Sequence, residues 1–107
     1  MNAVPNLPWS EQFRIVAKQW CDADSAASLL EDTKSAVLAE RMQAHADKPV
    51  NKAEQLVKSS VEWRSHVEKT VAARRASNLL KVQMEYLRMK FNEWQSAEAS
   101  KRAEMRL

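Results

Sequence analysis

Apolar and polar residues alternate with helical spacing along most of the chain, beginning close to the N-terminus. Four large apolar side chains, separated by four, three and four residues, share one helical face: Trp9, Phe13, Val16 and Trp20. Ser10 is expected to cap this first helix, after an irregular arm over residues 1–8 that contains two prolines. The polar run CDADS at 21–25 predicts the end of the first helix. A second helix is expected before Pro49, so that residues 10–46 form a hairpin of two helices.

Residues 51–107 predict a short helix followed by a long one. The short helix is expected over 51–58, and the long one begins near Ser60, after which neither proline nor glycine occurs. An unbroken helix of about 45 residues is about 70 Å long, which exceeds the width of a compact chain of this size. The long helix is therefore expected either to break or to protrude and contact another chain.

Two apolar faces are expected on the long helix. At about 100° per residue, five side chains lie in one arc and are expected to form the core: Leu80, Met84, Leu87, Phe91 and Trp94. Four others lie in a second arc, centred about 130° away, and are expected to form a seam between subunits: Leu79, Val82, Tyr86 and Met89. Trp63, Val67 and Val71 point to a third side, so a kink, a break or a change of packing partner is expected within 72–78. A monomeric three-helix bundle with frayed ends is the alternative to self-association.

Composition strengthens the helical prediction. The chain has 107 residues and no glycine, whereas average usage of about 7% would give about seven. Without glycine, tight hairpins between strands and left-handed helix caps are difficult to form. We therefore expect a single all-α domain over residues 1–107. Its N-terminal helical hairpin and long C-terminal helix are expected to assemble into an oligomeric helical bundle.

The residues that could carry chemistry do not predict an enzyme, a metal site or a cofactor. His45 and His66 lie in different segments. His45 is expected to be a charge near a helix C-terminus, and His66 is expected to be a helix-surface residue. Cys21 has no basic neighbour, so it is expected to be a small core residue rather than a reactive thiol. The acidic pairs within 22–24 and 31–32 are expected to be charges at helix N-termini.

Neither a membrane span nor a signal peptide is evident in the sequence. No run of about 18 apolar residues occurs, and the N-terminal segment MNAVPNLPW lacks a basic region followed by an apolar one. We therefore expect a cytoplasmic protein without a membrane partner, in a reducing compartment where a lone cysteine stays free.

Basic charge is concentrated in the second half of the chain. Residues 1–50 carry five basic and seven acidic side chains, whereas residues 51–107 carry twelve basic and seven acidic ones. Six basic residues, offset only by Glu85, predict a nucleic-acid-binding face: Lys69, Arg74, Arg75, Lys81, Arg88 and Lys90. Three of them recur every seven residues, so they form a stripe that can follow a phosphate backbone without reading bases.

Other interpretations of this basic stripe stay open. It also fits a solvated outer face of the helix, or a surface that neutralises an acidic partner, including the acidic half of a neighbouring copy. Trp63 is the aromatic side chain nearest to the stripe, which makes it a candidate for base stacking. A core position for Trp63 is the simpler interpretation.

The C-terminal half of the chain resembles small helical proteins of tailed phages and prophages. The residues that carry the resemblance are Ala53-Glu54, Trp63, the segment AARRAS, the run MEYLRMKF and Arg102-Ala103-Glu104-Met105. Such proteins look like distant relatives of UvsY-type recombination mediators, which are oligomeric helical proteins that bind single-stranded DNA. The resemblance implies an accessory role in phage DNA recombination or replication, with a phage or host recombination or replication protein as partner, in the cytoplasm of a host bacterium. A helical interaction or assembly factor without DNA binding is the alternative.

Overall fold

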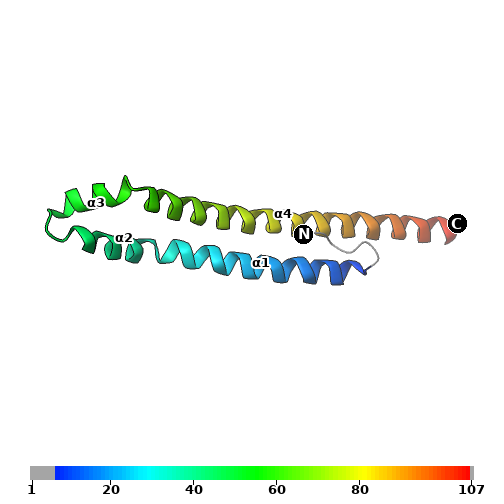
Figure 1. Cartoon of the computed structure of the whole chain (residues 1–107). Helices are drawn as coiled ribbons and strands as arrows, with labels where there is room; N and C mark the ends of the chain where they lie inside the picture. The colour runs from blue at the N-terminus through cyan, green and yellow to red at the C-terminus, as the bar shows by residue number, and fades with distance from the viewer. Residues whose placement is uncertain (1–6, 107) are drawn as a thin grey trace. The chain divides into compact units, whose positions relative to one another are not determined.

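The structure, a computed structural model, describes residues 7–106 and contains only helices and connecting turns over this range. In chain order (Figure 1) the elements are α1 (Trp9–Asp32), α2 (Lys34–Met42), the 3-10 helix η1 (Gln43–His45), α3 (Val50–Lys58) and α4 (Val61–Arg106). The all-α prediction is confirmed. Of the arm expected over 1–8, only Leu7 and Pro8 are described, and neither is helical.

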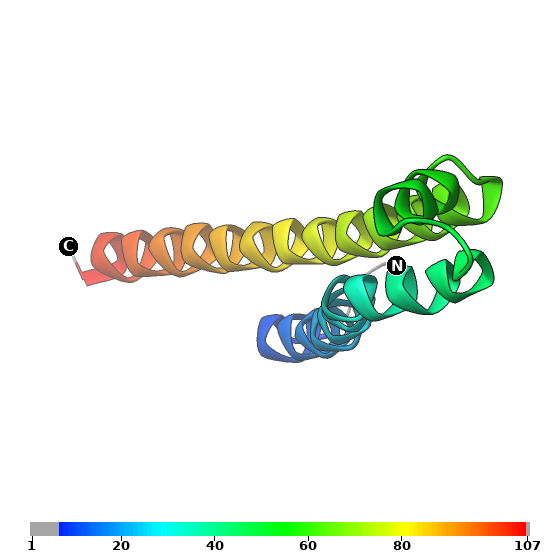
Figure 2. The same cartoon turned by 90° about the vertical axis from the view of Figure 1, so that its left-hand side faces the viewer.

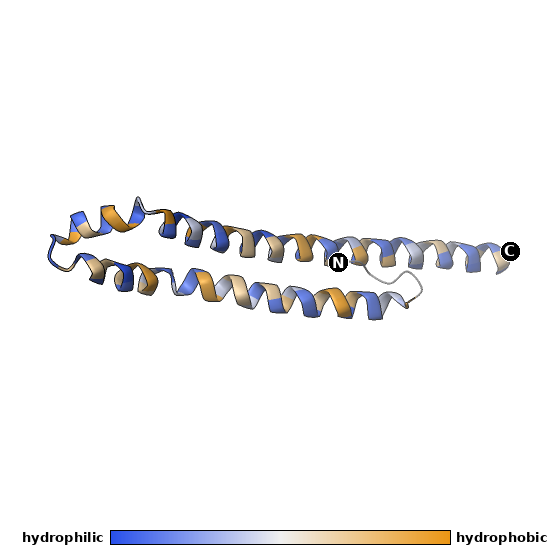
Figure 3. Cartoon of the chain, viewed as in Figure 1, coloured by the Kyte–Doolittle hydropathy of each residue, from blue (hydrophilic) through white to orange (hydrophobic). Residues whose placement is uncertain are grey.

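The chain divides into two compact units, each of which combines part of α1 with part of α4. Unit 1 contains the residues up to Cys21 and those from Asn78 onward, and unit 2 contains residues Asp22–Ser77. Hydrophobic and hydrophilic residues alternate along both long helices (Figure 3), as helices with one inward face require. The buried residues of unit 1 include Val16 and Leu87, and those of unit 2 include Ala27, Ala53, Val57, Trp63 and Ser77.

Helix α1 begins two residues before the position that the capping pattern predicts. The backbone N–H groups of Glu11 and Gln12 both donate to the carbonyl oxygen of Pro8 at 3.0 Å. Ser10 therefore lies inside the first turn and is not the N-cap. The buried side chain of Gln12 donates a further hydrogen bond of 2.7 Å to the carbonyl oxygen of Leu7, which fixes the path of the chain into the helix.

Helix α1 also continues through the polar run at 21–25, so the predicted break there is wrong. Ala23 and Ala27 extend the inward face beyond Trp20 by steps of three and four residues, and Ala27 is fully buried. Small alanine side chains thus keep the helix packed where large apolar residues are missing. The helix ends instead before Thr33, whose hydroxyl donates to the carbonyl oxygen of Leu29 at 2.7 Å.

In unit 2, the short helices α2 and α3 lie against each other and lead the chain back toward α4. Pro49 immediately precedes α3, so the short helix predicted over 51–58 is present, one residue longer at its N-terminus. The hydroxyl of Ser60 accepts a hydrogen bond from the backbone N–H of Trp63 at 3.1 Å and donates one to the carbonyl oxygen of Val57 at 2.6 Å. These bonds cap α4 near the position that the sequence predicts.

Helix α4 runs without interruption from Val61 to Arg106 (Figure 2), so a break within 72–78 is excluded. Its inward positions, all buried or half-buried, recur at seven-residue steps in two series: Trp63, Thr70, Ser77, Met84 and Phe91, and His66, Ala73, Leu80 and Leu87. An ideal helix drifts by about 20° per seven residues. Over four such steps this drift makes Trp63 and Phe91 appear to lie on different sides of the helix when residues are placed at a fixed angle, although both face inward.

The core predicted for α4 is correct except at its C-terminal end. Leu87 is buried, and Leu80, Met84 and Phe91 are half-buried. Trp94 is 47% exposed, so it is not a core residue; its ring stacks instead on that of Phe91, with 6.0 Å between the ring centroids. The segment 96–106 beyond it is helical and almost entirely exposed, as the sequence predicts.

Candidate functional site

Arg74 forms the centre of a polar cluster in unit 2. From α4 its guanidinium donates to Glu31 through Nε at 2.9 Å and Nη2 at 2.8 Å, and to Asp24 through Nη1 at 2.6 Å. The Ser28 hydroxyl accepts from Nη2 at 3.2 Å. The Ser77 hydroxyl donates to the Asp24 carboxylate at 3.5 Å. One guanidinium thus joins two carboxylates of α1, with the paired geometry that suits arginine best.

The charges of this cluster stabilise one another. Hydrogen bonding from Arg74 lowers the pKa of the Glu31 carboxyl, against a smaller opposing effect of desolvation. Hydrogen bonds to Glu31, and then to Asp24, raise the pKa of the Arg74 guanidinium. Arg74 therefore does not present a free cation to solvent, contrary to the phosphate contact expected from the sequence.

The predicted basic residues are spread around α4 rather than gathered on one face. Lys81 and Arg88 follow Arg74 at seven-residue steps along one flank of the inward face. Lys69 and Lys90 lie on the opposite flank, because they fall three residues after the inward positions His66 and Leu87. One nucleic-acid strand lying along α4 could therefore contact the cations of only one of the two flanks.

The contacts of these cations differ. Arg88 lies over the ring of Phe13 with its guanidinium carbon 5.8 Å from the ring centroid, and Lys90 is 4.0 Å from Glu93. The remaining three, Lys69, Arg75 and Lys81, form no ion pair with any residue in the described range 7–106. Of the six basic residues predicted to bind nucleic acid, these three and Arg88 are available to a polyanion.

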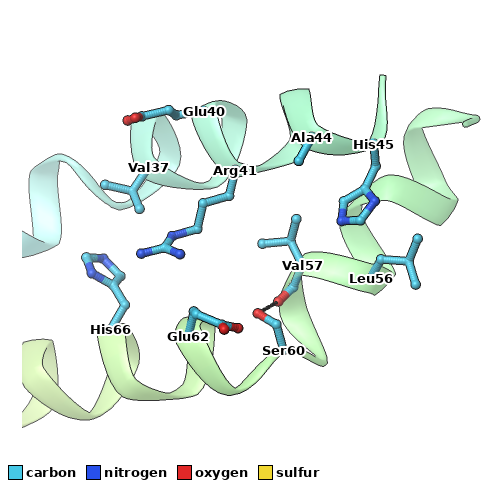
Figure 4. Close-up of a pocket in the computed structure, with 10 residues that line it drawn as sticks. All are labelled: Val37, Glu40, Arg41, Ala44, His45, Leu56, Val57, Ser60, Glu62 and His66. Carbon is cyan, nitrogen blue, oxygen red and sulfur yellow. Dashed lines mark hydrogen bonds between the residues drawn. The ribbon is translucent and has the colours of Figure 1, made fainter. Parts of the chain in front are cut away.

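A hollow of about 660 Å³ lies in unit 2, between α2, η1, α3 and the start of α4 (Figure 4). The side chain of Arg41 extends from α2 toward Glu62 and His66 on α4. The Nε2 atom of His66 is buried without a hydrogen-bond partner, and the His66 ring lies 5.4 Å from that of Trp63. The prediction of His66 as a helix-surface residue is therefore wrong.

The position of Trp63 also decides an alternative left open by the sequence. Its side chain is only 6% exposed, so it belongs to the core and is not available for base stacking. Cys21, by contrast, is exposed, and the prediction that it is a core residue is wrong. Within residues 7–106, no group of three or more histidine, cysteine, aspartate or glutamate side chains is arranged to hold a metal ion.

A second hollow, of about 410 Å³, lies in unit 1 where the start of α1 meets α4. Its lining is mainly aromatic and apolar, with Ser10 and Arg88 as the polar members: Trp9, Ser10, Phe13, Leu87, Arg88 and Phe91. Trp9 is thus a half-buried wall residue of this hollow.

The outward face of α4 carries an apolar stripe that nothing in the described chain covers. The stripe lies in unit 1 and consists of Leu79, Val82, Tyr86 and Met89, which are separated by three, four and three residues. Their side chains are 54%, 63%, 52% and 60% exposed, in that order. We call these four residues the outer seam. Their exposure agrees with a surface left for another chain, and their role between subunits stays a prediction.

Sequence reasoning missed the acidic partners of Arg74. Asp24 lies in the interior of α1 and Glu31 lies in its last turn, so neither is a charge at a helix N-terminus. Their seven-residue separation is the available signal, because it matches the spacing of inward-flanking positions on a packed helix. The spacing alone does not identify which basic residues face this acidic row, so Arg74 could not be assigned to it from the sequence.

No family model matches the chain, and no curated protein or solved structure matches it either. The resemblance to phage helical proteins therefore stays a prediction. No helix within residues 7–106 has both the length and the apolar character needed to cross a membrane.

Proposed function

We propose that this protein is a helical assembly factor that associates with a second copy of itself through the outer seam of α4. The observation that carries the proposal is the exposure of four apolar side chains at coiled-coil spacing on an outward helix face. Polar residues on this face would suit a solvated helix, whereas large apolar ones mark a surface that another helix covers.

The size of the outer seam predicts weak, reversible association. Complete burial of such a side chain contributes about 1.5–3 kcal/mol, so covering the exposed half of each residue contributes about 1 kcal/mol. Two copies bring eight such residues together, for about 8 kcal/mol in total. Association itself costs about 4–15 kcal/mol. The two quantities are of similar size, so the protein is expected to pair in a concentration-dependent manner.

Light scattering over a wide range of protein concentrations tests this proposal. The wild-type protein is expected to shift from the monomer mass of 12.3 kDa toward twice that mass as concentration rises. Val82→Glu and Tyr86→Glu are expected to hold the protein at the monomer mass, because each places a charge in the seam. Val61→Glu is the matched control, since Val61 is 77% exposed and lies outside the seam. A wild-type protein that stays monomeric at every concentration overturns the proposal.

Binding of single-stranded DNA is the second candidate function, and the resemblance to phage recombination proteins is what suggests it. The observation in its favour is that Lys69 and Lys81 are exposed and contact no carboxylate within the described residues, while Arg88 contacts only an aromatic ring. Such cations bind phosphates and release counterions, so affinity would fall steeply with salt.

Fluorescence anisotropy with a labelled oligonucleotide at two salt concentrations tests this second function. The double variant Lys81→Ala/Arg88→Ala is expected to bind more weakly and with a smaller salt dependence. Lys34→Ala/Lys52→Ala is the matched control, because both lysines are exposed on the short helices α2 and α3. Equal loss in the two double variants, or binding that is insensitive to salt, would rule out a DNA site on this flank of α4.

A further inference from the structure

Opposite charges stand at the two ends of the outer seam. Arg75 precedes Leu79 by four residues, and Glu93 follows Met89 by four residues, so both extend the same stripe along helix α4. Both side chains are exposed. Arg75 contacts no carboxylate within the described residues, and the one ion-pair contact of Glu93 there is the 4.0 Å approach to Lys90.

We infer that the second copy lies antiparallel on the outer seam, with Arg75 of each copy against Glu93 of the partner subunit. This inference rests on the proposed self-association and adds its direction and register. A parallel pair would bring the two Arg75 side chains together and the two Glu93 side chains together, which is unfavourable. An antiparallel pair turns both ends into attractive contacts, so the charges select one direction.

The apolar residues fit the same register. With Arg75 opposite Glu93, Val82 lies opposite Tyr86 of the partner subunit and Leu79 lies opposite its Met89. At the centre of the pair a small side chain then faces a large one, which is how facing helices fill space. A parallel pair would instead place tyrosine against tyrosine and valine against valine. The stripe from Arg75 to Glu93 is about 27 Å long at about 1.5 Å per residue, or about five helical turns.

Exchanging the two charges tests the inference by sedimentation equilibrium. Arg75→Glu alone and Glu93→Arg alone each place like charges together twice in an antiparallel pair. Each is therefore expected to weaken association about tenfold. The double variant Arg75→Glu/Glu93→Arg restores opposite charges at both ends and is expected to associate like the wild type. Arg102→Glu, an exposed substitution beyond the stripe, is the matched control.

The outcomes separate the register from the self-association on which it rests. If the wild type pairs but the double variant is no better than the single ones, the antiparallel register is wrong and self-association stands. If the single substitutions leave pairing unchanged, the charges do not meet and the register is again wrong. A wild type that never pairs overturns both proposals. High salt is expected to weaken the association of the wild-type protein and to reduce the difference in association between it and the single variants.

Discussion

Leu87 and Leu79 are a matched pair of positions on α4, because truncating each to alanine removes the same atoms from different surroundings. Leu87 is 4% exposed and packs in unit 1, whereas Leu79 is 54% exposed on the outer seam. Leu87→Ala loses the transfer free energy of a buried side chain and leaves a cavity, so it is expected to lower the free energy of unfolding by about 2–5 kcal/mol. Leu79→Ala loses roughly half the transfer term and leaves no cavity, for about 1 kcal/mol or less.

Urea unfolding followed by far-ultraviolet circular dichroism measures both effects. At low protein concentration Leu87→Ala is expected to shift the urea midpoint strongly without changing the slope, while Leu79→Ala shifts it much less. In thermal unfolding, a loss of about 2 kcal/mol corresponds to a decrease of about 8 °C or more for a chain of this size. At high protein concentration the wild type gains stability from pairing. Leu79→Ala is expected to lose that gain, and Leu87→Ala to keep it.

Two results would refute this reasoning. Equal destabilisation by the two substitutions at low concentration would mean that the outward face of α4 is packed within the monomer. A Leu79→Ala variant whose stability rises with concentration as much as that of the wild type would mean that pairing occurs elsewhere.

Three further outcomes follow from the described contacts. Because hydrogen bonding to Arg74 lowers the pKa of Glu31, this pair stabilises the fold above the ordinary glutamate pKa, and the stabilisation is lost as pH falls through the lowered value. Glu31→Gln should therefore be less stable than the wild type at neutral pH, and its urea midpoint should change less with pH through the acidic range; midpoints of variant and wild type that change in parallel would contradict this. The variants Trp94→Phe and Trp63→Phe identify the emission of each tryptophan by its loss. Acrylamide should quench the emission of Trp94, which is 47% exposed, and leave that of Trp63, which is 6% exposed, largely unquenched; equal quenching of the two would place Trp63 outside the core. Cys21 is exposed, so a thiol reagent should label the native protein as fast as the urea-unfolded protein, and protection in the native state would contradict that exposure.

The helical fold could be predicted from the sequence because it depends on local properties. The absence of glycine, the apolar spacing from Trp9 to Trp20 and the helix start predicted near Ser60 are each local features that indicate a helix independently of tertiary contacts. The polar run at 21–25 misled the prediction because alanine carries little hydrophobic signal. Ala27 nevertheless packs as a core residue, since a small side chain suits a close approach of the backbone.

The polar cluster could not be predicted in the same way, because it depends on contacts between residues far apart in the chain. Arg74 lies 43 residues from Glu31 and 50 residues from Asp24, and no local pattern reports such pairs. The outer seam was easier, since a stripe of four large apolar residues on one helix face is visible in the sequence. Its exposure could be established only once the inward face of α4 was known.

Tyr86 reports most directly on self-association through the outer seam, because it is the single tyrosine of the chain and lies in the middle of that seam. Incorporation of fluorotyrosine gives one fluorine resonance, whose position and sensitivity to solvent report the surroundings of this side chain alone. On raising the protein concentration, this resonance is expected to shift and its response to heavy water to decrease, as a second copy covers the outer seam. A resonance that keeps one position and one solvent response from the lowest to the highest concentration would contradict this expectation.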